Sequence, residues 1–81
     1  MTRPEVALLV VETLKKHSRK GVLPDDSIVD LFEGGYLDSF GLWESIADLE
    51  KATGVQVPDG EATPKNFSNV IQFVNRFSEG V

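Results

Sequence analysis

Apolar residues recur at helical spacing near the start of the chain. Between Thr2 and about Ser18, the positions i, i+3, i+4, i+7 and i+8 are filled by Val6, Leu9, Val10, Thr13 and Leu14. This spacing gathers the side chains on one face of a helix. Thr2 and Glu5 have the spacing of a capping box, in which each side chain accepts a hydrogen bond from the other's backbone. We therefore predict a helix from Thr2 to about Ser18.

A second helix is predicted from about Ser39 to Ala52. Gly54 follows it and is a typical residue for the end of a helix. Residues 19–37 form a long connection between the two helices, with apolar residues spaced along it: Leu23, Ile28, Val29, Leu31 and Phe32. A connection this long is either functional or pinned to the core by its apolar residues, and here we expect pinning.

The last third of the chain is predicted to hold one short and one longer helix. Thr63-Pro64 can open the short helix, since proline is favoured in a first turn. Ser68 is expected to cap the last helix, which would end at Gly80. No segment shows a convincing strand pattern. The chain is thus predicted to be all-α: a small four-helix bundle of three longer helices and one short helix, forming one domain over residues 1–81.

The predicted second helix carries two apolar stripes, rotated from each other by roughly a third of a turn. One consists of Leu42, Ile46 and Leu49, and the other of Phe40, Trp43 and Ala47. So small a bundle can hardly bury both, and we assign the first stripe to the core and the second to an exposed recognition patch. Trp43 could instead cover the loop containing Tyr36. The acidic residues beside the patch belong either to that surface or to an ordinary solvated face: Glu44, Asp48 and Glu50.

Composition excludes several classes of function. The chain has 81 residues, no cysteine, one histidine and a net charge of −5. Disulfides and thiolate metal sites are therefore excluded, and His17, which we expect to be exposed at the end of a helix, cannot form a metal cluster alone. The negative charge argues against nucleic-acid binding. No apolar run approaches the roughly 20 residues that span a bilayer. We expect a cytoplasmic monomer without metal or catalytic residues, and a core that includes Phe32, Phe67, Phe73 and Phe77.

The candidate chemistry lies where the second helix begins. If Asp38 is the N-cap, its carboxylate accepts hydrogen bonds from first-turn N–H groups, and the hydroxyl of Ser39 is left free. A phosphodiester on that hydroxyl would lie beside unpaired N–H groups at the positive end of the helix. No neighbouring base is available in the sequence to activate Ser39 as a nucleophile. Asp38-Ser39 alone is equally typical of an ordinary helix start.

The wider pattern resembles the phosphopantetheine attachment site of acyl carrier and peptidyl carrier proteins. The resemblance rests on Gly35 through Phe40 leading into an amphipathic helix, on Pro58-Asp59 beyond that helix, and on the stretch from Thr63 to Phe67. The Asp-Ser-Phe-Gly run at residues 38–41 is most similar to D-alanyl and peptidyl carrier proteins.

The resemblance implies a function and a set of partners. Ser39 would carry 4′-phosphopantetheine, transferred from coenzyme A by a phosphopantetheinyl transferase with Mg²⁺. The chain would be a carrier rather than an enzyme, holding acyl or aminoacyl thioesters for an adenylating loading enzyme and a downstream synthase or transferase. The residues that match the family's partner surface are Phe40, Trp43, Glu44, Ala47 and Glu50. A specialised biosynthetic pathway is favoured. The alternatives are a housekeeping fatty-acid acyl carrier protein and a helical interaction module that has no cofactor.

Overall fold

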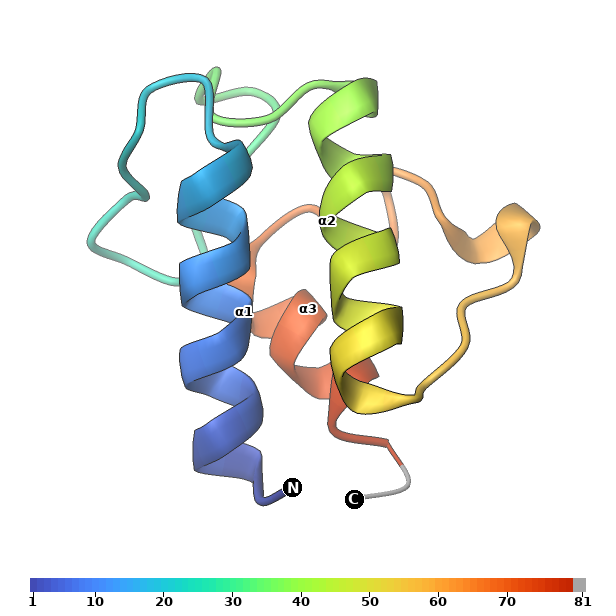
Figure 1. Ribbon diagram of the computed structural model, residues 1–81. Helices are drawn as coiled ribbons and strands as arrows, with labels where there is room; N and C mark the ends of the chain where they lie inside the picture. Colours follow the sequence, from blue (N-terminus) through green and yellow to red (C-terminus); the bar gives the residue numbers. More distant parts are fainter. Residues whose placement is uncertain (80–81) are drawn as a thin grey trace.

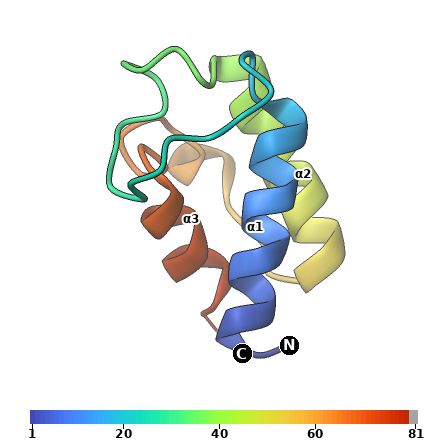
Figure 2. The ribbon, with the colours of Figure 1, turned by 90° about the vertical axis from the view of Figure 1, so that its left-hand side faces the viewer.

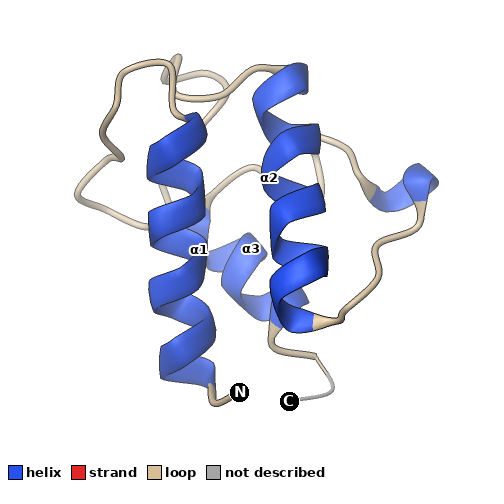
Figure 3. Ribbon diagram, viewed as in Figure 1, coloured by secondary structure: helices blue, strands red, loops and turns tan. Residues whose placement is uncertain are grey.

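The computed structural model describes residues 1–79, and all regular structure in that part of the chain is helical (Figure 3). Helix α1 spans Arg3–His17, α2 spans Ser39–Thr53 and α3 spans Val70–Phe77. A short 3₁₀ helix, η1, spans Asp59–Glu61. The all-α prediction is confirmed. None of these helices has the length and apolar character that a bilayer-spanning segment needs.

Helices α1 and α2 lie side by side and run in opposite directions, while the shorter α3 packs behind them (Figures 1 and 2). The long connection from α1 passes beside α1 and returns over the end of the bundle where α2 begins. The connection from α2 to α3, which contains η1, extends on the other side of α2. The first turn of α2 therefore lies at one end of the molecule, between the two long connections.

The ends of α1 and α2 follow from local hydrogen bonds. The Thr2 hydroxyl accepts from the Glu5 N–H at 3.4 Å, and the Glu5 carboxylate accepts from the Thr2 N–H at 2.8 Å, so the predicted capping box is present. Gly54 ends α2 with a φ of 79°, a left-handed conformation that glycine adopts without steric cost.

The prediction of a short helix that begins at Thr63-Pro64 is wrong. The N–H groups of Asn66 and Phe67 both donate to the Thr63 carbonyl at 3.1 Å, which closes a single turn and no more. Phe67 then points into the core with 1% of its surface exposed, so the chain changes direction instead of continuing as a helix. The only short helical element between α2 and α3 is η1, which lies earlier than predicted.

The start of α3 also differs from the prediction. Asn69 is the N-cap, accepting from the Gln72 N–H at 2.9 Å. Ser68, the expected cap, instead donates its N–H and hydroxyl to the Gln72 side-chain oxygen, each at 2.6 Å. Because the polar groups of Ser68 are engaged by the Gln72 side chain, the N-cap of α3 is the next residue, Asn69. Gly80, the expected end of the helix, lies outside the described residues.

The long connection is pinned at fewer points than predicted. Leu31 and Leu37 are buried, and the Leu31 N–H donates to the Ser68 carbonyl at 2.7 Å, which ties the connection to the start of α3. The Asp30 carboxylate accepts from two N–H groups of the following turn. Ile28 and Val29, expected to help in pinning, are exposed instead. Phe32 is only partly buried, at the margin of the core.

The core forms where the three helices meet. The predicted stripe of α2 is buried, with Leu42 and Leu49 at 0% and Ile46 at 5% exposure. Aromatic rings from the end of the chain fill the space beneath α2, and the ring centroids of Phe67 and Phe73 lie 4.8 Å apart. Phe77 is fully buried as well. Burial of each large apolar side chain contributes about 1.5–3 kcal/mol.

Ser45 is the polar exception on the buried face of α2. Its side chain is fully buried, and its hydroxyl has no hydrogen-bond partner within the described residues. An unpaired buried hydroxyl destabilises a fold, and alanine favours helix more than serine does. We predict that Ser45→Ala leaves the free energy of unfolding unchanged or raises it by up to about 1 kcal/mol. Urea denaturation measures this, and a clear loss of stability would contradict the assignment.

Candidate functional site

Ser39 is the first residue of α2 and is exposed to solvent. The preceding Asp38 is the N-cap, and its carboxylate accepts a hydrogen bond from the Gly41 N–H at 2.8 Å. The Asp38 carbonyl accepts from Leu42 at 2.9 Å, which begins the helical ladder. The N–H groups of Ser39 and Phe40 have no carbonyl within the helix to bind, because they belong to its first turn. The Ser39 hydroxyl thus stands in water at the positive end of α2.

Basic side chains from the α1–α2 connection lie close to this helix start. The Arg19 guanidinium is 3.8 Å from the Asp38 carboxylate, and the Arg19 N–H donates to the Tyr36 carbonyl at 2.8 Å. Lys20 places its ammonium 4.5 Å from the centre of the Tyr36 ring. The hydrogen bond from the Arg19 N–H to Tyr36 holds this cationic segment beside the loop that leads to Ser39. An anionic phosphodiester on Ser39 therefore fits its surroundings, which offer a helix N-terminus and a nearby guanidinium.

The Ser39 hydroxyl has no general base beside it in the described part of the chain. No side chain within residues 1–79 hydrogen-bonds its hydroxyl, and no group of three or more potential metal ligands occurs there. An enzyme that uses serine as a nucleophile places a general base within hydrogen-bond reach of the hydroxyl. Ser39 is therefore accessible from solvent and has no general base beside it in this part of the chain.

Gly41 lets the first turn of α2 approach the end of α1 closely. A Cβ atom built at this buried position would lie 3.1 Å from Leu37 Cδ2 and 3.4 Å from the His17 carbonyl oxygen. A Cβ atom would therefore crowd the Leu37 side chain and touch the His17 carbonyl, so little room remains for a larger side chain. The sequence reasoning missed this role, because a glycine early in a helix reveals nothing of what packs on it.

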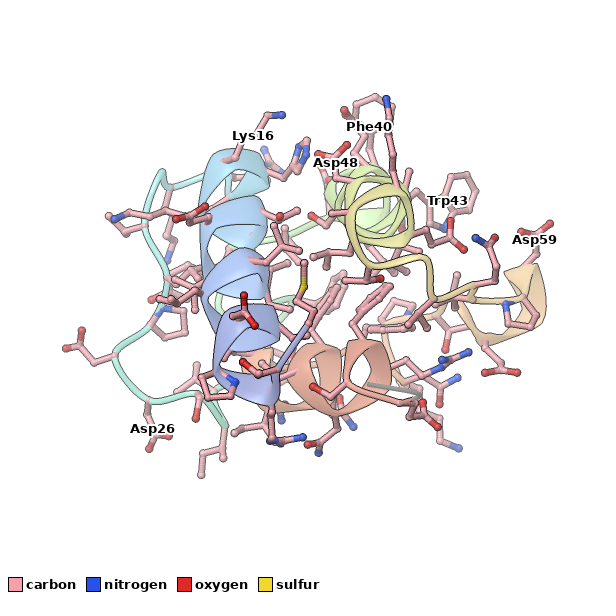
Figure 4. All side chains as sticks on the ribbon, turned by 60° about the horizontal axis from the view of Figure 1, so that its bottom comes forward. Lys16, Asp26, Phe40, Trp43, Asp48 and Asp59 are labelled. Atoms are coloured by element: carbon pink, nitrogen blue, oxygen red, sulfur yellow. The ribbon has the colours of Figure 1, made fainter. Side chains whose placement is uncertain are left out.

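The prediction that His17 is exposed is wrong. Its side chain is 12% exposed, and its Nε2 lies 2.7 Å from the Asp48 carboxylate of α2. Its Nδ1 is 4.0 Å from the Glu44 carboxylate, and Lys16 lies 3.7 Å from Asp48 (Figure 4). Glu44 and Asp48 are four residues apart and therefore adjacent on α2, so one ring at the end of α1 lies between them. The sequence places His17 at a helix end but gives no sign of the helix beside it.

The second apolar stripe of α2 lies on the surface. Phe40 is 69% exposed and Trp43 is 63% exposed, and both project from α2 (Figure 4). Ala47 and Glu44 are exposed too. The alternative in which Trp43 covers the loop with Tyr36 is wrong, because its ring is largely open to solvent on the side of the α2–α3 connection. Glu50 is half-buried, and its carboxylate accepts from the Val57 N–H at 2.8 Å.

A groove of 420 Å³ lies between α2 and the α2–α3 connection. Four apolar side chains, one indole and two carboxylates line it: Ile46, Ala47, Val57, Ala62, Trp43, Glu50 and Asp59. Trp43 and Asp59 lie on this same side of α2 in Figure 4. The sequence indicated the α2 wall of the groove but not its other wall, since no local pattern fixes the path of the irregular connection over residues 55–62.

Comparison with known proteins supports a carrier protein. The chain is 27% identical over 70 residues to the D-alanyl carrier protein of Bacillus velezensis, and the match covers 86% of this chain and 90% of that protein. No protein-family model and no solved structure matches the chain. The similarity extends over nearly all of both chains, and so supports the carrier family as a whole rather than the Asp-Ser-Phe-Gly run in particular.

The contact between His17 and Asp48 predicts how stability responds to acid. The hydrogen bond from His17 is the main cause that lowers the pKa of Asp48, and the charge of Lys16 adds to it. A lowered pKa in the folded state stabilises the fold above the ordinary pKa, and this contribution is lost as pH falls through the lowered value. We therefore expect wild type to exceed Asp48→Asn in free energy of unfolding by no more than about 1 kcal/mol near neutral pH.

This difference should shrink as pH falls below the ordinary pKa of an aspartate, and it should be lost once pH passes the lowered pKa of Asp48. Urea denaturation from pH 7 downward measures it. Glu12→Gln, which removes an exposed carboxylate from α1, is the matched control and should show no such trend. A difference between wild type and Asp48→Asn that stays constant with pH would contradict the assignment.

Proposed function

We propose that this chain is a carrier protein that holds acyl or aminoacyl groups as thioesters on a 4′-phosphopantetheine arm attached to Ser39. One observation carries the proposal: in a chain similar along most of its length to a D-alanyl carrier protein, an exposed serine begins the helix that an aspartate caps. The similarity supports a non-catalytic carrier. The attachment residue, the cofactor and the pathway are the proposal's own additions.

Ser39 is the acceptor in the proposed modification. Its Oγ forms a bond to the phosphorus that bears the pantetheine chain of coenzyme A, and the bond from that phosphorus to the rest of coenzyme A breaks. The 3′,5′-ADP portion leaves, and the hydroxyl proton goes to a base supplied by the phosphopantetheinyl transferase, with Mg²⁺ on the diphosphate. The first-turn N–H groups and Arg19 then lie near the new negative charge.

The attached thiol supplies a reactive thioester, and tethering turns its delivery into a local event at high effective concentration. The chain's own residues fix the point of attachment and offer a surface to other proteins. We propose that this surface is the exposed patch Phe40, Trp43 and Ala47, flanked by Glu44 and Glu50. An adenylating loading enzyme and a downstream synthase or transferase are the proposed partners, in the cytoplasm.

The charges on α2 bear on which kind of carrier this is. Asp48 contacts His17 and Lys16, Glu44 lies near His17, and Glu50 accepts a backbone N–H. Most of the carboxylates of α2 are thus engaged in contacts within the chain, while the side chains of Phe40 and Trp43 remain exposed. This favours docking through apolar contacts and a specialised pathway over a fatty-acid carrier read mainly by its charges.

Attachment to Ser39 is tested by mass spectrometry. Purified protein is incubated with coenzyme A, Mg²⁺ and a transferase of broad specificity, and its intact mass is measured. We expect a gain of one phosphopantetheinyl group in wild type and none in Ser39→Ala, because no other hydroxyl occupies the start of α2. Ser45→Ala is the control and should gain the group like wild type, since Ser45 is buried. Unmodified wild type would favour the cofactor-free interaction module.

The role of Trp43 is tested by separating docking from stability. Because the side chain is 63% exposed, Trp43→Ala should change the free energy of unfolding by no more than about 0.5 kcal/mol. Loss of a central aromatic contact typically weakens an interface by about 2 kcal/mol, so kcat/KM of the loading enzyme should fall roughly 30-fold. Phe73→Ala, in the core, should show the opposite result, a large loss in the free energy of unfolding with little direct effect on docking. A large loss of stability in Trp43→Ala would instead place Trp43 in the core.

A further inference from the structure

The groove beside α2 has an unusual mixture of linings. Its floor is apolar, formed by Ile46, Ala47, Val57 and Ala62, and the indole of Trp43 forms part of its wall. The only charged residues that line it are two carboxylates, Glu50 and Asp59. Glu50 is held in place because one of its oxygens accepts the Val57 N–H at 2.8 Å. The groove therefore combines a small apolar surface with fixed negative charge and no lining cation to neutralise it.

This mixture favours a cationic occupant over a neutral one. An ammonium group is attracted to the face of an indole and to carboxylates that remain partly hydrated. A neutral acyl group of the same shape would gain only the apolar contacts with the floor of the groove. The space deeper beneath α2 is filled by buried aromatic rings, Phe67, Phe73 and Phe77, so the groove accommodates a group at the surface rather than a long chain in the interior.

The groove also lies at a suitable distance from Ser39. Its linings on α2 begin at Trp43 and extend to Glu50, which is 11 residues beyond Ser39. Eleven residues correspond to about 16 Å along a helix. A pantetheine arm has about 13 bonds between phosphorus and sulfur and spans about 15 Å at the extension per bond of an extended backbone. A group carried at the end of such an arm can therefore reach the level of Glu50.

We propose that this groove binds the ammonium group of an aminoacyl cargo, with Trp43, Glu50 and Asp59 as the residues that recognise the positive charge. The inference rests on the function proposed above and narrows its cargo from acyl or aminoacyl groups to cationic ones. Glu50 has two roles, since one carboxylate oxygen holds the connection through Val57 and the charge faces the groove.

The test compares two cargoes of the same shape on the intact protein. The transferase loads Ser39 from coenzyme A analogues that carry either an alanyl or an isobutyryl group in a stable amide linkage. The two differ by an ammonium in place of a methyl group. Two-dimensional NMR then follows the indole N–H of Trp43, the single tryptophan, and the backbone N–H of Val57. Intact mass confirms that both samples are fully loaded.

We expect the alanyl form to shift these signals about two- to fivefold more than the isobutyryl form, relative to protein that carries the arm alone. High salt should reduce the difference. Glu50→Gln, whose amide oxygen can still accept the Val57 N–H, should reduce it as well, whereas Glu12→Gln should not. Equal shifts from the two cargoes on fully loaded protein would overturn this inference and leave the proposed function intact. Failure to load Ser39 would overturn the proposed function itself.

Discussion

The close contact between the first turn of α2 and the last residue of α1 is the constraint on which the site depends. The backbone at Gly41 lies so close to the end of α1 that a Cβ atom there would be in van der Waals contact, at 3.4 Å, with the His17 carbonyl oxygen. The His17 ring then bonds Asp48 about two turns further along α2. Two contacts spaced along one helix fix its direction as well as its position. Because Leu42 is fully buried just after this turn, Ser39 is left exposed at the rim of a rigid element.

This geometry separates the side of α2 that is buried in the fold from the side that is exposed to solvent. One side of α2 is buried against α1 and α3, and its acidic side chains are drawn into contacts with α1 and the following connection. The other side carries exposed aromatic residues and one wall of the groove. Substitutions on the exposed side should therefore have little effect on the free energy of unfolding, since few buried contacts depend on them.

Much of the fold and of the candidate site was predictable from the sequence, where local patterns decide the outcome. The capping box at Thr2, the cap at Asp38 and the buried stripe on α2 depend on spacing within a few residues, and local physics fixes them. The errors lie where distant residues compete. The turn at Thr63 stops because Phe67 enters the core, Ser68 loses its capping role to a contact with Gln72, and His17 is covered by a helix that begins 22 residues later. The groove needs the path of an irregular connection, which no periodicity encodes.

The most direct test of the account is the modification state of the protein as the producing organism makes it. Protein purified from that organism can be digested and analysed by tandem mass spectrometry, which locates any attached group on a single residue. The account predicts a phosphopantetheine group, free or acylated, on the peptide that contains Ser39 and on no other peptide. Protein that is unmodified under conditions where it is functioning, or that carries the group on a different residue, would contradict it.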